Sequence, residues 1–457
     1  MDSLVIVLDW FYFLTIFLLA ILSIYSFVQE KEWKALIKGI LIFGPFSIFI
    51  AILLVFNFPI KPWIILSILV VNGIIILLII LPLGKPHSIG IKGEQKSVDE
   101  RDALFHRFYR LKPGTSEYEA YYRDHPEKFE FDQKLRSMPG LGNPGSKAYH
   151  PFTSPFQEAI FSVLGGMTRE IEWQPEPIEG KPIQATPEEF TQRIKGFASY
   201  LGADLVGTTR LNPAYIYSHI ARGAGEWGTP IELNHTHAIA IAVEMRHDMI
   251  RHAPETPTIT ESAFSYYKNA KIALILAKYI NLLSYEARAH VDGNYRVMCI
   301  PIASDAGLGE LGRLGLLITP EFGPRVRLSV VTTNLPLLED KPIAFGVQHF
   351  CSICKKCAVN CPTASIDMGE KAVHNGVEKW LSDQDNCYRF WRIQGTDCAI
   401  CVKVCPYSYP RAPMHNMIRW LVRRNSFARR IAFMGDEFFY GKRPKHLGSF
   451  PAWHNQK

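Results

Sequence analysis

The sequence predicts an α+β protein in successive parts: three membrane-spanning helices, a mixed α/β core and a compact cysteine-rich module. Three observations predict this order. The first ninety residues are strongly apolar, the middle of the chain alternates strand-like and helix-like patterns, and eight of the nine cysteines fall in the last quarter. A chain of 457 residues, 48% of them hydrophobic, is long enough for an anchor plus one large or two modest folded units.

The apolar runs cover residues 4–28, 36–58 and 63–83. Each approaches the roughly 20 residues that cross the hydrocarbon core of a bilayer. Buried core helices are the alternative, but they fit poorly because the three runs follow one another with almost no polar face. We therefore expect residues 1–84 to form a three-helix transmembrane anchor.

The positive charges beside these runs predict the orientation, because cytoplasmic flanks collect lysine and arginine. Lys31, Lys34 and Lys38 follow the first run, Lys61 alone separates the second and third, and many basic residues follow the third. No basic leader typical of a cleaved signal peptide precedes the first run. The prediction is a multi-pass protein of the cytoplasmic membrane, with the region after residue 84 in the cytoplasm.

The middle of the chain divides at about residue 156. Residues 85–155 are polar and rich in glycine and proline, and we interpret them as a linker and wrapping segment. Residues 156–340 carry mixed patterns typical of an α/β core. Residues 238–245, 297–302 and 328–333 are predicted as buried strands, and residues 267–283 as a helix with one apolar stripe.

The cysteine-rich module covers residues 341–410. Its first four cysteines have the spacing C-x2-C-x2-C-x3-C-P, which is typical of a [4Fe-4S] site, and the tail of that motif recurs once. Structural zinc and disulfides are the alternatives; zinc favours separated C-x2-C pairs, and a cytoplasmic location disfavours disulfides. In two-cluster ferredoxins the fourth cysteine of each run binds the other cluster. We therefore expect two [4Fe-4S] clusters, one bound by Cys351, Cys354, Cys357 and Cys405 and the other by Cys361, Cys387, Cys398 and Cys401. The ninth cysteine, Cys299, is predicted to be a buried, unreactive thiol.

A glycine-rich loop occupies residues 305–313, "DAGLGELGR". It contains a literal G-x-G-x-x-G, but no acidic residue follows at the distance a dinucleotide site requires. Glycines also allow a backbone to approach a flat cofactor closely, and a plain tight turn is the alternative. The candidate cofactor-binding residues are Gly307, Leu308, Gly309, Glu310, Gly312 and Arg313.

Several segments together carry a resemblance to a known family. "YLGADLVGTTRLNPAYIYS" (200–218), "IPIASDAGLGELGRLGLLITPEFGPRVRLSVV" (300–331), "KPIAFGVQHFCSICKKCAVNCP" (341–362) and "DEFFYGKRPK" (436–445) resemble the corrinoid-dependent reductive dehalogenases. The similarity extends over about residues 150–445. It implies a nitroreductase-like α/β core that holds base-off cobalamin and a ferredoxin-like part with two [4Fe-4S] clusters. No D-x-H-x-x-G motif occurs, which agrees with base-off binding without a protein histidine on cobalt.

The resemblance also implies three catalytic residues. Tyr266, at the start of the predicted helix, matches the proton donor, and Asn294 and Arg327 match the two residues that assist it. Tyr267 and Arg325 are the adjacent alternatives. Removal of a halide needs two electrons and one proton, and a tyrosine with an ordinary pKa near 10 becomes a better acid beside a cation.

The implied function is reductive removal of halide from a small organohalide by Co(I) cobalamin, supplied with electrons through the clusters. Respiratory members of the family are typically exported with a twin-arginine leader and held by a separate small protein with three transmembrane helices, whereas this chain is expected to fuse the catalytic and anchor functions. Membrane lipid and an electron donor (ferredoxin, flavodoxin or quinol) are the expected partners. Residues 411–457, a basic extension, are expected to pack on the core.

Two rival functions remain open at this point. Epoxyqueuosine reductase shares the cobalamin core and the clusters but is soluble and acts on transfer RNA, and the predicted anchor argues against it and against a nucleic-acid partner. A membrane ferredoxin that only conducts electrons would not need the large domain between the linker and the clusters.

Overall fold

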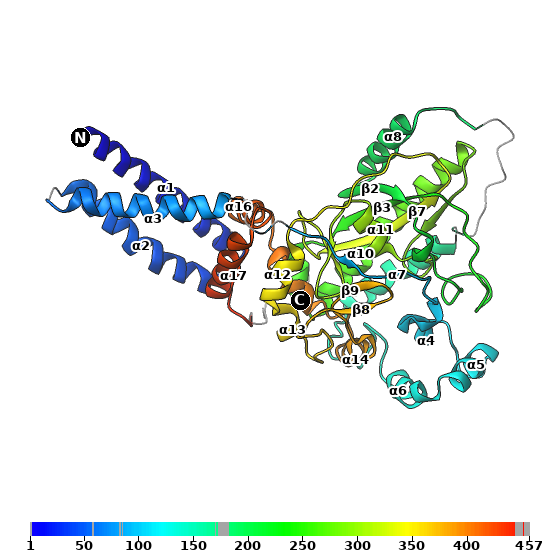
Figure 1. Ribbon diagram of the computed structural model, residues 1–457. Helices are drawn as coiled ribbons and strands as arrows, with labels where there is room; N and C mark the ends of the chain where they lie inside the picture. Colours follow the sequence, from blue (N-terminus) through cyan, green and yellow to red (C-terminus); the bar gives the residue numbers. More distant parts are fainter. Residues whose placement is uncertain are drawn as a thin grey trace. The chain divides into compact units, whose positions relative to one another are not determined.

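The computed structural model describes residues 2–56, 59–81, 84, 86–169, 171, 182–443 and 451. The chain forms two compact units, each built from separate stretches of sequence. The first contains Met1–Ser88, Ala344–Lys356 and Tyr409–Pro444, and the second contains Ile89–Ile343, Cys357–Ser408 and Lys445–Lys457. Figure 1 shows the elements of both units coloured along the chain.

The first unit consists of helices. Its N-terminal helices are α1 (Asp2–Gln29), α2 (Trp33–Val55) and α3 (Lys61–Ile80), which lie side by side in Figure 1. Two segments, Trp33–Leu53 and Lys61–Ile79, are long and apolar enough to cross a membrane, and α1 supplies a shorter apolar stretch, Phe13–Gln29, among the residues searched. Large apolar side chains such as Phe11, Leu41 and Trp63 are about two-thirds exposed (67%, 67% and 69%). Water solvates such an apolar surface poorly.

Three further helices complete this unit: α12 (Val347–Cys354), α16 (Pro413–Val422) and α17 (Ser426–Tyr440). Buried polar contacts join α16 and α17 to the N-terminal helices and α17 to the end of α12. The carboxylate of Glu30 pairs with His415 Nε2 and accepts a hydrogen bond of 3.0 Å from the Tyr440 hydroxyl. Asn425 Nδ2 donates to the Leu78 carbonyl at 2.9 Å, and Lys356 Nζ pairs with Asp436 at 2.6 Å.

Most of the C-terminal extension, Tyr409–Pro444, belongs to the helical unit. The expected packing of the extension on the α/β core stays a prediction. Its basic residues include side chains that form structural contacts: Arg429 is buried and its Nε donates to the Val422 carbonyl at 2.9 Å, and Arg424 stacks on Trp420 with 3.9 Å between guanidinium and ring centre. Sequence periodicity shows that a helix is amphipathic but does not show which surface covers its apolar side.

The second unit is organised around a four-stranded antiparallel sheet in the order β2-β3-β7-β4. The strands are β2 (Leu205–Arg210), β3 (His237–Glu244), β7 (Val326–Thr333) and β4 (Ala287–His290). Alternate residues of β3 point to opposite faces. Ile239, Ile241 and Val243 pack with helices α7 (Thr153–Arg169), α8 (Pro187–Tyr200) and α10 (Thr256–Leu282), whereas Ala238, Ala240 and Ala242 pack with α11 (Cys299–Asp305).

The predicted strands at 238–245 and 328–333 are confirmed as β3 and β7. The predicted strand at 297–302 is wrong, because this apolar run forms helix α11. A short apolar run carries no periodicity that separates a strand from a buried helix. The predicted helix exists as α10 but begins at Thr256, with Pro257 in its first turn, so Tyr266 lies well inside the helix and not at its start.

Short elements surround the sheet in this unit. The segment predicted as linker and wrapping contains β1 (Gly90–Ile91), η1 (Glu100–Asp102), α4 (Leu104–Tyr109), α5 (Ser116–Asp124) and α6 (Pro126–Arg136). The cysteine-rich module contributes β8 (Ala372–His374), β9 (Val377–Lys379), α14 (Gln384–Gln394), α15 (Ile400–Lys403) and η4 (Pro406–Ser408). Strand β1 pairs with β9, and the buried Arg107 pairs with Asp132 at 3.1 Å and with Asp385. The segment is thereby fixed to the cysteine-rich module.

Candidate active site and cluster ligands

A cavity of about 470 Å³ lies within the second unit. This volume is within the range of small-molecule sites. Its wall combines residues from the 85–155 segment, from α7 and α10, from the turn after β4, from β7 and from the cysteine-rich module. The lining residues are Phe105, Tyr109, Arg110, Leu141, Phe161, Arg222, Gly223, Ile259, Ser262, Tyr266, Asp292, Gly293, Tyr295, Arg327, Trp391 and Asp397.

Tyr266 and Arg327, two of the predicted catalytic residues, meet in this cavity. The Arg327 guanidinium lies 4.8 Å from the centre of the Tyr266 ring. Arg327 Nη2 donates to Ser262 Oγ and to Asp397 Oδ2, both at 2.6 Å. Helix α10 is held to β7 at this point, because Asn269 Nδ2 donates to the Arg327 carbonyl at 2.9 Å. The position of the guanidinium over the ring is therefore fixed from both elements.

The environment of Tyr266 keeps its phenol protonated. Burial raises the pKa of Tyr266 to about 12, and the nearby Arg327 cation opposes part of this rise. The Arg327 cation lowers the pKa of Tyr266, as expected from the sequence. The loss of hydration on burial outweighs it, because a buried phenolate lacks the stabilisation of water.

Asn294, the third predicted catalytic residue, lies behind the cavity wall. Its side chain is buried, and its Oδ1 accepts a hydrogen bond of 2.8 Å from Arg288 Nη2. A Cβ at Gly223, which does line the cavity, would stand 2.6 Å from Asn294 Oδ1. The residue of this turn that carries a carboxylate into the cavity wall is Asp292.

Sequence reasoning missed Asp292, although a signal was present. It precedes Gly293, which has φ of +80°, and the Asn294 amide donates to the Val291 carbonyl at 2.9 Å to close a tight turn. Asp-Gly directly after a strand is a strong turn signal. Only the tertiary fold shows that this turn borders the same cavity as Tyr266.

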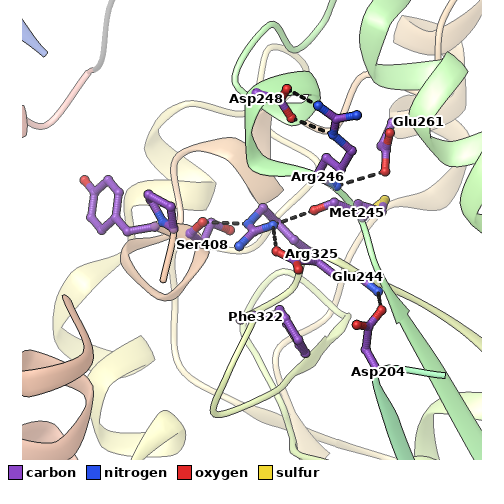
Figure 2. Close-up of polar contacts among 12 residues, drawn as sticks. Asp204, Glu244, Met245, Arg246, Asp248, Glu261, Phe322, Arg325 and Ser408 are labelled. Atoms are coloured by element: carbon purple, nitrogen blue, oxygen red, sulfur yellow. Dashed lines mark hydrogen bonds and ion pairs between the residues drawn. The ribbon is translucent and has the colours of Figure 1, made fainter. Parts of the chain in front are cut away.

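Arg325 and Tyr267, the adjacent alternatives, lie elsewhere. Arg325 is completely buried, and Figure 2 shows it joining the end of β3 to the chain after the last cysteine. Its Nε donates to the Ser408 carbonyl at 2.6 Å and its Nη1 to Glu244 Oε1 at 2.7 Å. The Tyr267 ring stacks with the Phe264 ring, with 6.2 Å between the ring centres. Neither residue is part of the cavity wall, so Tyr266 and Arg327 are the better candidates.

The glycine loop forms a tight hairpin of β5 (Glu310–Leu311) and β6 (Leu317–Ile318). A Cβ on Gly309 would stand 2.2 Å from the Ile318 carbonyl oxygen, and one on Gly307 would stand 2.7 Å from that of Lys341. Close packing of the chain on itself therefore accounts for both glycines. Leu308, Glu310 and Arg313 are buried, and Arg313 Nη1 donates to the Asp367 carbonyl at 2.7 Å. A cofactor contact by this loop stays a prediction.

Four of the predicted cluster ligands come together in the second unit. Burial and the neighbouring Cys361 raise the pKa of Cys387 to about 11, and burial with Cys387 among the neighbours raises that of Cys398 to about 12. Burial raises the pKa of Cys401 well above its ordinary value, and Cys398, Cys357, Cys387 and Cys361 add to the rise, so Cys401 also interacts with a thiol of the other predicted set. These thiols are free, and they repel one another as thiolates. Bound iron would remove this cost, because it stabilises the thiolate form.

The backbone beside these cysteines includes two unusual conformations. Cys398 and Ala399 have positive φ values of +59° and +52°, which are uncommon for residues other than glycine. The Ser365 amide donates to Cys361 Sγ at 3.2 Å, a contact that suits a cluster-bound sulfur. Among the residues that the structure describes, no group of three His, Cys, Asp or Glu side chains is close enough to hold a single metal ion.

The other predicted ligand set is divided between the units. Cys351 and Cys354 belong to α12 in the helical unit, and Cys357 and Cys405 belong to the second unit, so their shared cluster stays a prediction. Cys299 is the first residue of α11 and is partly buried. Burial raises the pKa of its thiol to about 12, which agrees with an unreactive residue.

Comparisons with known proteins find a cluster-binding domain and similar whole proteins. Residues 350–409 match the 4Fe-4S dicluster domain family. The chain is 32% identical over 311 residues to tetrachloroethene reductive dehalogenase of Sulfurospirillum multivorans. The matched region covers 60% of this chain and 62% of the relative. It is 28% identical over 404 residues to a tetrachloroethene reductive dehalogenase of Desulfitobacterium hafniense, covering 74% of this chain and 72% of the relative.

Solved structures of reductive dehalogenases also resemble this chain. Catabolic reductive dehalogenase NpRdhA, in complex with 3-bromo-4-hydroxybenzoic acid, superposes with a TM-score of 0.63 at 25% identity, over 79% of this chain and 49% of that one. The chain spans 62% of the first curated relative and half of the second. The match to the cysteine-rich module places this chain in the class of proteins with a 4Fe-4S dicluster domain. Over most of its length the chain is similar to reductive dehalogenases.

Proposed function

We propose that the protein is a corrinoid-dependent reductive dehalogenase that replaces a halogen of an organohalide by hydrogen, using two electrons and one proton. One observation carries this proposal: Tyr266 and Arg327 share a cavity with Trp391 and Asp397, which belong to the iron–sulfur module. A candidate proton donor and the electron-transfer module thus border one space of substrate size. A simple electron conduit needs no such cavity.

The proposal includes base-off cobalamin held by a nitroreductase-like core. One solved neighbour, described as a reductive dehalogenase whose structure suggests a mechanism for B12-dependent dehalogenation, supports the cofactor, with a TM-score of 0.64 and 25% identity. The cavity wall leaves open space beside Gly293, where no atom lies within 4 Å of the position that a Cβ would take. When bound, the corrinoid would supply the low-potential metal centre that accepts electrons from the clusters and reacts with the carbon–halogen bond.

The protein side chains would supply the proton and control charge. Tyr266 would carry the proton on its phenol oxygen and donate it to the substrate carbon. Arg327 stabilises the phenolate that remains after transfer, and its buried Nε, which has no hydrogen-bond partner among the described residues, is a donor suited to a departing halide. Asp397 and Ser262 fix the guanidinium in place. Asn294 would act on the reaction only through the turn that carries Asp292.

The pH dependence of turnover follows from the raised pKa of Tyr266, about 12. The protonated donor form persists below this pKa, so we expect kcat to show no alkaline loss between pH 7 and about 10.

Arg327→Gln removes the cation that opposes the rise in the Tyr266 pKa, so the tyrosine becomes a still weaker acid. Its kcat should fall by about 10- to 100-fold, again without an alkaline limb. Halide release measured across this pH range tests both statements, and a loss of activity centred near pH 8 would contradict them.

The proposed location is the cytoplasmic membrane, with α1–α3 as a multi-pass anchor in contact with lipid and the second unit in the cytoplasm. Two sufficiently long apolar helices and the lysines after α1 support it. Ferredoxin, flavodoxin or a membrane quinol would supply electrons. Protease treatment of sealed, right-side-out cells should leave the region after residue 84 intact; its digestion would place that region on the outer side.

The proposed function is tested by dehalogenation itself. The full chain is purified anaerobically from a corrinoid-supplied host and mixed with a low-potential chemical reductant and a chlorinated or brominated substrate. We expect halide release that requires the reductant and stops when cobalamin is omitted from the host. Release of no halide from either substrate class by protein that contains both cofactors would contradict the proposal.

A further inference from the structure

Two of the three arginines in the cavity wall pair with carboxylates. The Arg222 guanidinium pairs with the buried Glu100 at 2.9 Å, and Arg327 pairs with Asp397 at 2.6 Å. Arg110 donates through both terminal nitrogens to the carbonyls of Gly223 and Gly225, at 2.9 Å each. The two carboxylates compensate two of the cations, and the third cation has its terminal nitrogens engaged by backbone oxygens.

Asp292 adds one more carboxyl group to this wall. It stands in the turn after β4, and in the part of the chain that the structure describes it forms no ion pair of 4 Å or less. Burial raises the pKa of Asp292, and the cations Arg222 and Arg327 oppose the rise. An ionised Asp292 would repel an anion, and a protonated Asp292 would add no positive charge to attract one.

The rest of the wall is apolar or aromatic. It is formed by Phe105, Leu141, Phe161, Ile259, Tyr295 and Trp391. Such a surface favours a substrate that loses little hydration when it enters. A carboxylate or phenolate substrate would lose its hydration and find two guanidinium groups already paired with carboxylates, with Arg327 Nε the donor that lacks a partner among the described residues.

We propose that the cavity selects electrically neutral organohalides and that Asp292 is the residue that rejects anionic ones. This inference rests on the proposed dehalogenation only for the identity of the ligands as organohalides. It predicts a preference opposite to the acidic ligand, 3-bromo-4-hydroxybenzoic acid, that the solved neighbour holds.

Matched ligand pairs that differ in charge alone test the inference. A bromobenzamide is compared with the corresponding bromobenzoate, and a dichloroacrylamide with the corresponding dichloroacrylate. Affinity is measured by isothermal titration calorimetry on the cofactor-loaded full chain, and kcat and KM for halide release are measured in parallel. The wild type should bind the neutral member of each pair about tenfold or more tightly than the anion, and the preference should appear in KM.

Three variants assign the preference to Asp292. Asp292→Asn should reduce the neutral-to-anion affinity ratio by about tenfold or more, mainly through tighter binding of the anion. Asp292→Glu keeps the charge and should keep the ratio. Asp124→Asn makes the same charge change on the exposed end of α5 and should behave as the wild type.

The outcomes separate this inference from the proposed function. Selective binding without halide release would contradict dehalogenation and leave the selectivity intact. Equal wild-type affinity for the two members of each pair, or an unchanged ratio in Asp292→Asn, would overturn the inference even in an active dehalogenase. The wild-type comparison decides the matter if Asp292→Asn does not fold.

Discussion

Tyr266→Phe is expected to reduce halide release by about 10²- to 10⁴-fold, the usual contribution of a positioned general acid. The substitution removes the phenol hydroxyl and keeps the ring on which the Arg327 guanidinium is stacked at 4.8 Å. The cavity should therefore keep its shape, and the loss should appear in kcat with KM little changed. Anaerobic assays with excess reductant measure it directly.

Tyr267→Phe is the matched control for this prediction. It makes the same chemical change at the adjacent position of α10, on a ring that stacks with Phe264 outside the cavity wall. It should retain wild-type turnover. Normal dehalogenation by Tyr266→Phe, with iron and cobalt contents equal to the wild type, would show that the proton comes from another group.

Cys401→Ser is expected to remove one iron–sulfur cluster and to abolish turnover. Cys401 is proposed to bind one cluster with Cys361, Cys387 and Cys398, so its loss leaves three thiolates for that cube; its thiol interacts electrostatically with these three and with Cys357. Iron should fall from about eight to about four per chain, because each cluster holds four irons. Iron analysis and the electron paramagnetic resonance of the reduced protein measure this change.

Cys299→Ser provides the control for the cluster prediction. Cys299 is the one cysteine outside the two proposed ligand sets, and burial raises the pKa of its thiol to about 12. Its replacement should leave about eight irons per chain. A Cys401→Ser protein that retains the wild-type iron content and spectrum would contradict the assignment of that cluster.

The sequence predicted those parts of the fold that depend on local pattern. The alternating run at β3 and the long helix α10 were both identifiable, because their side chains repeat with the period of the element. The run at 297–302 was assigned to a strand and forms the helix α11, since six apolar residues carry no such period. The start of α10 was missed because residues 256–265 are mostly polar or small, and tertiary packing buries them.

The candidate site also combines residues that a local sequence pattern identifies with residues that only the tertiary fold brings together. Cysteine spacing identified the thiols, because cluster ligands must converge within a short loop. Resemblance led to Tyr266 and Arg327, and the cavity brings them together. Asp292 and the aromatic residues Phe105 and Tyr109 were not identified, because they come from a turn and from a segment interpreted as a linker. Which loops border a cavity is a property of the assembled sheet and its coverings, and no local pattern encodes it.

The account depends on a corrinoid that receives electrons from two cubane clusters. The most direct test is metal analysis of the full chain, purified without oxygen from a corrinoid-supplied host. We expect about eight iron, eight sulfide and one cobalt per chain. Protein with its full iron and sulfide that contains no cobalt, and takes none up on incubation with cobalamin, would contradict the account and leave only an electron carrier.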